Sequence, residues 1–372
     1  MSSDFEQLVE ALAAEAATHA AEVDRGTFPS RTLRRLGETG LLGLASSREV
    51  GGRGEGLPAA AHVVERLARE CGSTAMIVCM HYCGTAVIEQ HGPREVREAI
   101  AAGRHLTTLA FSEPGSRSQF WAPLGTATPD GADVRLSARK SFVTSAHHAD
   151  SYVWSSKPAA GGELSTLWLV PRTAAGLRHE GAGFDGIGLR GNDSSPVTAE
   201  DVRVPEAARL GGDGAGFGIM MGVGLPWFNV LSAAVSCGLM EAAVQKTAVH
   251  AAGTRFEHAG ASIADLPTAR AYVARMRIAT DQAKPLLADT IAAIGAGRPD
   301  ATLRVLESKA CAGEAAAAVT ELAMRVCGGA AFRKEVGVER VFRDARAAQV
   351  MGPTTDALYD FIGKAVCGLP VF

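Results

Sequence analysis

Over roughly its first hundred residues, the chain repeats apolar positions at helical spacing. The segments FEQLVEALAAEAATHAAEV, SRTLRRLGETGLLGL, AAAHVVERLARE and REVREAIAAG place apolar residues three and four apart and are rich in alanine, leucine, glutamate and arginine. That period and composition are typical of amphipathic helices. The pattern predicts an N-terminal helical domain over residues 1–106.

The pattern changes in the middle of the chain. HLTTLAFSE, DVRLSARKSFVTS, SYVWSS, STLWLVP and SPVTAEDVRVP are short runs rich in β-branched and aromatic residues, separated by turn signals such as PDGAD and RGNDSS. Such runs are typical of strands joined by turns. They predict a central antiparallel β domain over residues 107–212.

Helical spacing returns after GGDGAGFG and continues to the end of the chain. Three long alanine-rich segments begin with WFNVLSAAV, DLPTARAYV and TLRVLESKA, and each has a broad apolar face. Broad faces suit helices that contact more than one neighbour, as in a bundle. The expected fold is therefore α+β, with an N-terminal helical domain, a central β domain and a C-terminal four-helix bundle over residues 213–372.

One apolar stretch is long enough to span a bilayer. Residues 214–240 contain no charged residue, which a transmembrane helix would also show. The stretch also contains Pro226, Asn229, Ser232 and Ser236, and it directly follows GGDG. We expect a loop that leads into a buried helix, and no membrane span.

Composition and charge narrow the function classes. The net charge is −3 without a basic run, which argues against nucleic acid as the main partner. Seven scattered cysteines form no CxxC pair and no cluster with metal-ligand spacing, so we expect reduced thiols and no metal site. The acidic, amphipathic N-terminus lacks the pattern of a signal peptide, and we expect a cytoplasmic protein.

Five segments, in order along the chain, resemble the acyl-CoA dehydrogenase superfamily. LAFSEPGSRS (109–118) is similar to its T-E-P-x-A-G-S-D motif, and ARKSFVTSAHHADSYV (138–153) to its G-x-K-x-W-I-T-N segment. VRVPEAARLGGDGAGF (202–217) resembles the exit from its β domain, and Arg255 stands at its R-x-x-F-G. MRVCGGAAFRKEVGVERVFRDAR (324–346) resembles its Q-x-x-G-G and E-R-x-x-R-D-A-R segments. The resemblance covers essentially the whole chain and implies an FAD-dependent oxidoreductase that acts on an acyl thioester, bound to CoA or to a carrier protein.

The resemblance also implies roles for individual residues. Phe142 would pack on the flavin ring where the family has tryptophan, Thr144 would bind flavin N5, and Arg255 would reach the FAD pyrophosphate of a neighbouring subunit in a homodimer or homotetramer. The other residues implied in FAD binding are Phe111, Ser112, Ser118, Arg325, Gly328, Gly329 and Thr354. From the residues alone, Phe142 and Thr144 could equally be an ordinary strand pair, and Gly328-Gly329 a helix C-cap.

The chain departs from the family at the catalytic base. The family's glutamate comes from one of two places, which here hold Gly352 and Phe228, and neither side chain accepts a proton. Asp356 and His81 are the replacement candidates, although Asp356 could be an exposed carboxylate at a helix start and His81 a buried structural histidine.

Two other function classes stay open at this point. One is a flavin monooxygenase of the same fold, which would use O₂ and reduced flavin from a separate reductase, with His81 and Thr144 steadying a flavin intermediate. The other is a thioester-binding relative that no longer dehydrogenates. An electron-transfer partner is expected for the dehydrogenase.

Overall fold

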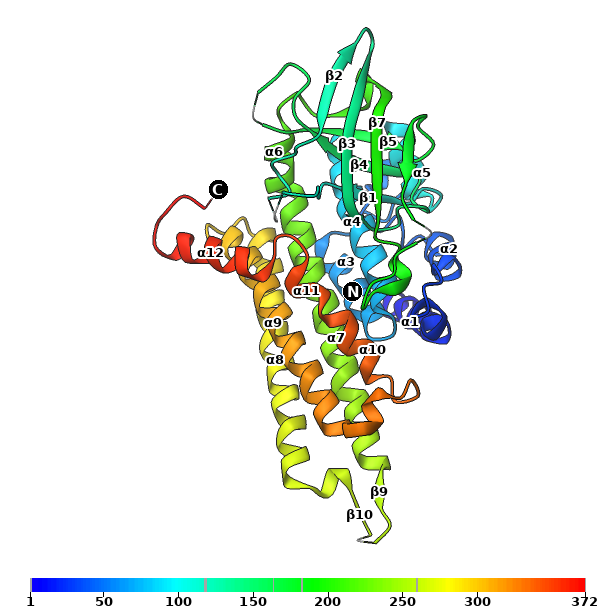
Figure 1. Ribbon diagram of the computed structural model, residues 1–372, viewed down its shortest axis with the longest axis vertical. Helices are drawn as coiled ribbons and strands as arrows, with labels where there is room; N and C mark the ends of the chain where they lie inside the picture. The colour runs from blue at the N-terminus through cyan, green and yellow to red at the C-terminus, as the bar shows by residue number, and fades with distance from the viewer. Residues whose placement is uncertain (1, 117–118, 163, 182, 259, 372) are drawn as a thin grey trace. The chain divides into compact units, whose positions relative to one another are not determined.

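The computed structural model describes residues 2–116, 119–162, 164–181, 183–258 and 260–371. Its contacts divide the chain into two compact units, which are described separately. Unit 1 comprises Met1–Ala60, Met76–Asp185 and Arg190–Phe228, and unit 2 comprises Ala61–Ala75, Gly186–Leu189 and Asn229–Phe372. The expected fold class is confirmed: the chain has an N-terminal helical region, a middle β region and a C-terminal helical region (Figure 1).

The helices of unit 1 bury the apolar stripes that the sequence predicted. In α1 the Ser2 hydroxyl accepts a hydrogen bond from Phe5 N at 3.3 Å, and the buried face includes Val9, Leu12 and Ala16. The helices that lie wholly or mainly in this unit are α1 (Ser3–Val23), α2 (Ser30–Glu38), α4 (Gly72–His91), α5 (Arg94–Ala101) and α6 (Gly216–Ile219). Short turns of 3₁₀-helix occur at Arg48–Val50, Arg190–Asn192 and Glu206–Ala208, and Met220–Gly224 forms a turn of π-helix.

Two four-stranded sheets form the β region of unit 1. One has the order β1-β4-β5-β8, and the other has the order β2-β3-β7-β6. Their strands are β1 (Thr107–Ala110), β2 (Thr126–Asp130), β3 (Asp133–Val143), β4 (Ser151–Ser156), β5 (Thr166–Pro171), β6 (Leu177–His179), β7 (Ser195–Pro205) and β8 (Arg209–Leu210). The purely antiparallel expectation is wrong for one pair, because β1 lies parallel to β4, with Thr107 opposite Ser151. The chain leaves the first sheet to form β2 and β3 in the other before it returns as β4, so no tight hairpin constrains this pair.

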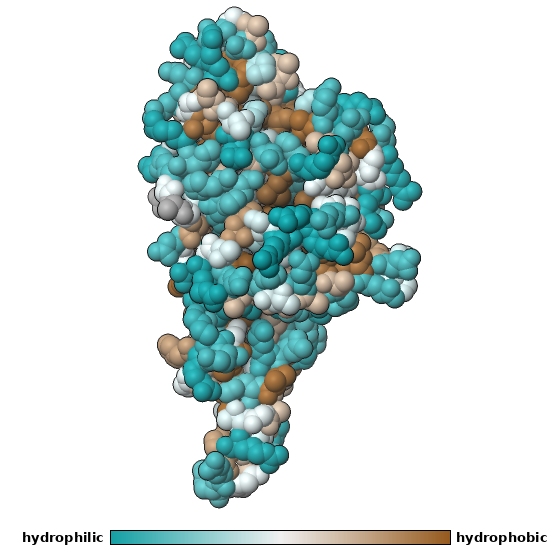
Figure 2. Space-filling view, turned by 90° about the vertical axis from the view of Figure 1, so that its right-hand side faces the viewer, coloured by the Kyte–Doolittle hydropathy of each residue, from teal (hydrophilic) through white to brown (hydrophobic). Residues whose placement is uncertain are grey.

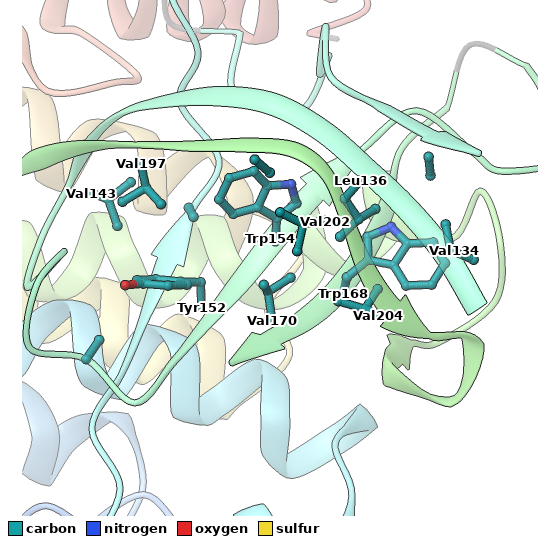
Figure 3. Close-up of a cluster of buried hydrophobic side chains, with 14 of the residues drawn as sticks. Val134, Leu136, Val143, Tyr152, Trp154, Trp168, Val170, Val197, Val202 and Val204 are labelled. Atoms are coloured by element: carbon teal, nitrogen blue, oxygen red, sulfur yellow. The ribbon is translucent and has the colours of Figure 1, made fainter. Parts of the chain in front are cut away.

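The core of the β region lies between the two sheets. Trp154 and Trp168 have no exposed surface, and Tyr152, Leu136 and Val202 pack in the same cluster (Figure 3). Every residue of β4 is buried, which explains why SYVWSS is a continuous apolar and small-residue run without polar alternation.

Unit 2 is built from long helices. The helices α8 (Pro267–Gly295) and α9 (Ala301–Cys327) run side by side, and the hairpin β9 (Arg255–Phe256) with β10 (Ala261–Ser262) lies between α7 and α8 in the sequence (Figure 1). The remaining helices are α10 (Val338–Ala345), α11 (Ala347–Val350) and α12 (Thr355–Val366), with 3₁₀ turns at Ile263–Asp265 and Gly328–Phe332. Among the described residues, α3 (Leu57–Ala68) and α7 (Leu225–Gly253) contribute residues to both units, as does α4, whose first four residues belong to unit 2.

Two helical stretches have the length and apolarity of a membrane span. They are Gly216–Gly253 and Ala301–Phe332, and 67% and 44% of their most apolar windows are buried inside the protein. Buried core helices pass the same test. The expected helix is present, but the expected loop before it is wrong beyond Ala215, because the chain is helical from Gly216 onwards.

Hydrophobic side chains also remain on the surface. Figure 2 shows a mainly hydrophilic face on which hydrophobic residues gather in separate patches. In unit 2 the most exposed large apolar side chains include Phe332, Val350 and Val249. Surface apolar residues of this kind are common and do not by themselves define a site.

Candidate functional site

The end of β3 presents an aromatic ring to solvent. The register with β7 shifts between Lys140 and Val143, and Phe142 within this bulge has φ +52° and a side chain that is 71% exposed. Bulges re-aim side chains, and positive φ is uncommon for a bulky residue. The backbone therefore turns Phe142 out of the strand pattern, so the ordinary alternation that the sequence allowed does not hold here.

Hydroxyl and main-chain groups on neighbouring segments form hydrogen bonds near the end of β3. The Oγ1 of Thr144 lies 3.1 Å from the Oγ of Ser194, and Ser141 N donates a hydrogen bond of 2.9 Å to the carbonyl oxygen of Ser112. A shallow pocket of about 150 Å³ is lined by Ser141, Phe142, Gly183, Phe184, Asp185, Ser194, Ser195 and Pro196. Four of the predicted contacts, Phe111, Ser112, Phe142 and Thr144, thus belong to neighbouring segments of unit 1, whereas Ser118 lies outside the described residues.

The strand is anchored below the bulge by a buried ion pair. The Nζ of Lys140 donates to Glu113 Oε1, to Ser155 O at 2.7 Å and to Ser155 Oγ at 2.9 Å. Glu113 also accepts hydrogen bonds from Leu124 N and Gly125 N, and burial lowers the pKa of Lys140 to about 8. Glu113 is therefore occupied by structural contacts.

The structure contradicts a catalytic role for His81. Its ring is fully buried, Nε2 lies 3.0 Å from Leu42 O, and Nδ1 lies 3.2 Å from Thr107 N. The carbonyl requires a donor and the amide requires an acceptor, so the neutral ring with its proton on Nε2 satisfies both. Burial lowers the pKa of His81 to about 4. Neither nitrogen is free to take a proton from a substrate, and the monooxygenase alternative loses one of the two residues on which it relied.

In unit 2 the predicted phosphate-binding residues gather at the end of α9. Arg325 is exposed and donates from Nη2 to Tyr272 Oη at 2.8 Å, with its guanidinium 4.7 Å from the ring centroid. Gly328 has φ +56°, and a Cβ at Gly328 or Gly329 would meet nothing within 4 Å. A small apolar cluster of Ala251, Ala269 and Val326 places the neighbouring residue Arg255, also exposed, at this same end of unit 2.

The segment VMGPTT forms the turn between α11 and α12. Thr354 is the N-cap of α12, and its hydroxyl accepts a hydrogen bond from Ala357 N at 3.3 Å. Asp356 is exposed in the first turn of that helix. Thr355 is buried, and among the described residues its hydroxyl has no hydrogen-bond partner.

The two family positions for the base hold no carboxylate in the structure. Gly352 lies in this turn, and Phe228 lies on α7 beside Asn229, which is fully buried and donates from Nδ2 to Val305 O at 3.3 Å. The Oδ1 of Asn229 has no partner within the described part of the chain. An amide and an aromatic ring cannot act as bases at this site.

The sequence interpretation missed Lys309. Its Nζ is buried and donates to Ala348 O at 3.2 Å, Met351 O at 3.1 Å and Pro353 O at 2.7 Å. A signal was present, because Lys309 stands three and four residues after Leu306 and Val305, on the apolar stripe of α9.

Lys309, in the first half of α9, and the residues at the C-terminal end of that helix cannot meet around one small group. Lys309 and Arg325 are sixteen positions apart, which corresponds to about 24 Å along a helix. The turn that contains Thr354 is hydrogen-bonded to Lys309. Within one chain, Thr354 therefore lies far from Arg325 at the C-terminal end of α9. An extended ligand or a second copy of the chain is needed to use both.

Comparisons with known proteins match nearly the whole chain to one family. Family models described as the N-terminal, middle and C-terminal domains of acyl-CoA dehydrogenase match residues 3–103, 108–202 and 214–367. The mitochondrial short-chain specific acyl-CoA dehydrogenase of Bos taurus is 30% identical over 91% of this chain and 82% of its own length. The L-prolyl-[peptidyl-carrier protein] dehydrogenase of Pseudomonas fluorescens is 28% identical over 91% of this chain and 90% of its own.

A comparison with solved structures finds a similar fold in an acyl-CoA dehydrogenase. The structure of butyryl-CoA dehydrogenase from Megasphaera elsdenii superimposes with a TM-score of 0.90 at 22% identity and covers 98% of this chain and 97% of its own. At that identity the likeness shows the fold alone.

Proposed function

We propose that this chain, which belongs to the acyl-CoA dehydrogenase family, oxidises an acyl thioester without a glutamate at either family position. Family membership makes it an oxidoreductase with FAD as its cofactor. The observation that supports the proposal is the match of all three family domains along one chain, which at the re-aimed end of β3 carries Thr144 and an aromatic ring, Phe142, where the family has tryptophan.

The residues present fit a flavin. In unit 1 the exposed ring of Phe142 offers an aromatic face and the Thr144–Ser194 hydroxyl pair offers a donor. In unit 2, taken by itself, the buried Thr355 hydroxyl has no partner among the described residues. Phe111 and Ser112 would add main-chain hydrogen bonds. When bound, FAD supplies the acceptor for the hydride that leaves the substrate.

The chain's own residues must orient the thioester and receive its α-proton. Asp356 is the only carboxylic acid in the sequence MGPTTDAL, and we propose it as the proton acceptor. Its exposure in the first turn of α12 leaves it accessible to substrate, and it follows Thr354, an expected cofactor contact, by two residues.

The partners follow from the same proposal. Arg255, Arg325, Gly328 and Gly329 would bind the FAD pyrophosphate of a second copy, so the protein would act as a homodimer or homotetramer. An electron-transfer protein would reoxidise the flavin, and the cytoplasm is the proposed location. The substrate carrier is CoA or a carrier protein, and the Pseudomonas relative is named for a carrier-protein substrate.

The test is an anaerobic titration of the purified protein. The flavin is first extracted and identified, and acyl-CoA and acyl-carrier-protein thioesters are then added while the absorbance of oxidised flavin is recorded. Stoichiometric bleaching by one thioester class, with an α,β-unsaturated product, supports the proposal. A protein that binds no flavin in either redox state, or flavin that no thioester bleaches, contradicts it.

A further inference from the structure

The turn between α11 and α12 has a surplus of main-chain acceptors. α11 is a single turn that ends at Val350, so its carbonyl groups find few amide partners beyond the helix. Pro353 has no N–H, which removes a main-chain donor from the same turn. Buried carbonyls without a donor are costly, so another group must supply these hydrogen bonds.

Lys309 supplies them from α9. Its amine donates to the carbonyl oxygens of Ala348, Met351 and Pro353, which together span the turn from its entry to the residue before Thr354. An ammonium group has three N–H donors, which matches the three carbonyl oxygens of this turn. These three hydrogen bonds attach the whole turn to α9, and we call them the Lys309 tether.

The packing of α11 on α9 keeps the tether short. A Cβ at Gly313, one turn after Lys309, would meet the Cβ of Ala348 at 3.5 Å, and Gln349 Nε2 donates to Glu314 Oε1 at 2.8 Å. α11 therefore lies directly against the turn of α9 that follows Lys309.

We propose that Lys309 is a positioning residue of the flavin site, whose ammonium group holds the 348–353 turn so that Thr354 and Thr355 face the cofactor. The inference rests on the proposed function for its cofactor part only. Lys309 touches neither substrate nor cofactor in this role, because it acts through the main chain of the turn. The missing glutamate is irrelevant to the tether, since all three acceptors are backbone atoms.

The protonation of Lys309 provides a readout. Burial lowers the pKa of Lys309 to about 7. Above that pH the neutral amine keeps two donors, so one of the three carbonyls loses its hydrogen bond. The turn should loosen as the pH rises through about 7.

Other titratable groups also lie on the elements packed against the turn. Burial raises the pKa of Cys311 on α9 and of Tyr359 on α12 above their usual values. Glu314 on α9 accepts from Gln349, and Arg346 before α11 donates to Ala317 O and to the Thr320 hydroxyl. Asp356 on α12 is exposed. A pH effect confined to the turn would therefore belong to Lys309.

The first experiment is hydrogen exchange on the cofactor-free full chain, with Lys309→Met and with Lys364→Met as a matched control. Lys364 is a partly exposed lysine of α12 that pairs with Asp360 at 2.8 Å. We expect amide protection over residues 351–358 to fall at least ~10-fold in Lys309→Met, as three charge-assisted bonds are lost, and to stay unchanged in the control. Equal protection in Lys309→Met and wild type overturns the tether.

The wild-type protein supplies an independent arm if Lys309→Met does not fold. Protection of the same amides, corrected for intrinsic exchange, should fall between about pH 6 and about pH 9. Protection that stays flat across this range overturns the tether even without the variant.

FAD retention then separates the two proposals. After reconstitution and gel filtration, we expect Lys364→Met to keep the wild-type FAD-to-protein ratio and Lys309→Met to lose FAD. A loosened turn with full FAD retention overturns the cofactor part of the inference. A wild-type protein that binds no FAD overturns the proposed function, while the exchange data still decide the tether.

Discussion

A substitution at His81 tests whether this histidine supports the fold or the reaction. The ring is held neutral between Leu42 O and Thr107 N, and we chose His81→Gln because glutamine can donate to the carbonyl without titrating. The variant loses the second hydrogen bond, so at neutral pH we expect it to be less stable by about 1–3 kcal/mol.

The pH dependence of the wild type follows from the pKa of His81. Burial lowers this pKa from 6.5 to about 4, so between these values the unfolded chain binds more protons than the folded one. The stabilisation is fully present above about pH 6.5 and is lost as the pH falls to about 4. At 1.36 kcal/mol for each pH unit, the difference amounts to about 3 kcal/mol.

The assay is urea unfolding, followed by circular dichroism, at several pH values from about 4 to about 7.5. Wild type should lose stability relative to His81→Gln as the pH falls, so that the two free energies of unfolding converge or cross. Flavin reduction by a thioester substrate should keep its wild-type rate in the variant. Parallel stability curves, or a variant that folds but cannot reduce its flavin, would refute the structural assignment.

Three further substitutions test other parts of the site. Lys140→Met should lower the unfolding free energy by about 3–5 kcal/mol because it leaves the buried Glu113 carboxylate unpaired. The double variant Lys140→Met with Glu113→Gln should recover part of this loss. If the losses of the two single variants simply add in the double variant, the pairing is contradicted. Phe142→Ala should weaken FAD binding several-fold, because about 1 kcal/mol of aromatic packing is lost; fluorescence titration with FAD measures this effect. The unfolding free energy of the cofactor-free protein should change by less than about 0.5 kcal/mol, because the ring is exposed. Asp356→Asn should slow flavin reduction by about 10²–10⁴-fold at unchanged FAD content in stopped-flow mixing, and an unchanged rate removes Asp356 from the mechanism.

Periodicity alone located most of the secondary structure. SYVWSS and STLWLVP became β4 and β5, and TLRVLESKA opened α9, because long apolar repeats leave few alternatives for burial. The parallel pairing of β1 with β4 could not be foreseen in the same way. Pairing direction depends on where the chain travels between two strands, and the local pattern of neither strand records that path.

Polar residues inside the fold were harder to interpret from sequence. His81 lies in the predicted N-terminal helical domain and Lys309 on a predicted helix, yet their roles depend on main-chain groups 26 to 44 positions away. A histidine that binds Leu42 O and a lysine that binds Pro353 O look the same in sequence as an exposed histidine and lysine. Only their place on apolar stripes indicated burial, and burial does not reveal the partner.

The turn that lacks the glutamate shows why the base and the cofactor contacts are separable in this fold. Lys309 holds the turn through carbonyl oxygens, and Thr354 starts α12 through its own hydroxyl, so neither contact involves the side chain at position 352. Replacement of a glutamate by glycine there removes a proton acceptor without removing a support of the turn. A chain with these contacts can keep a shaped cofactor site while its proton transfer moves to another group. Retention of the flavin-binding fold is therefore no evidence that the original base chemistry persists.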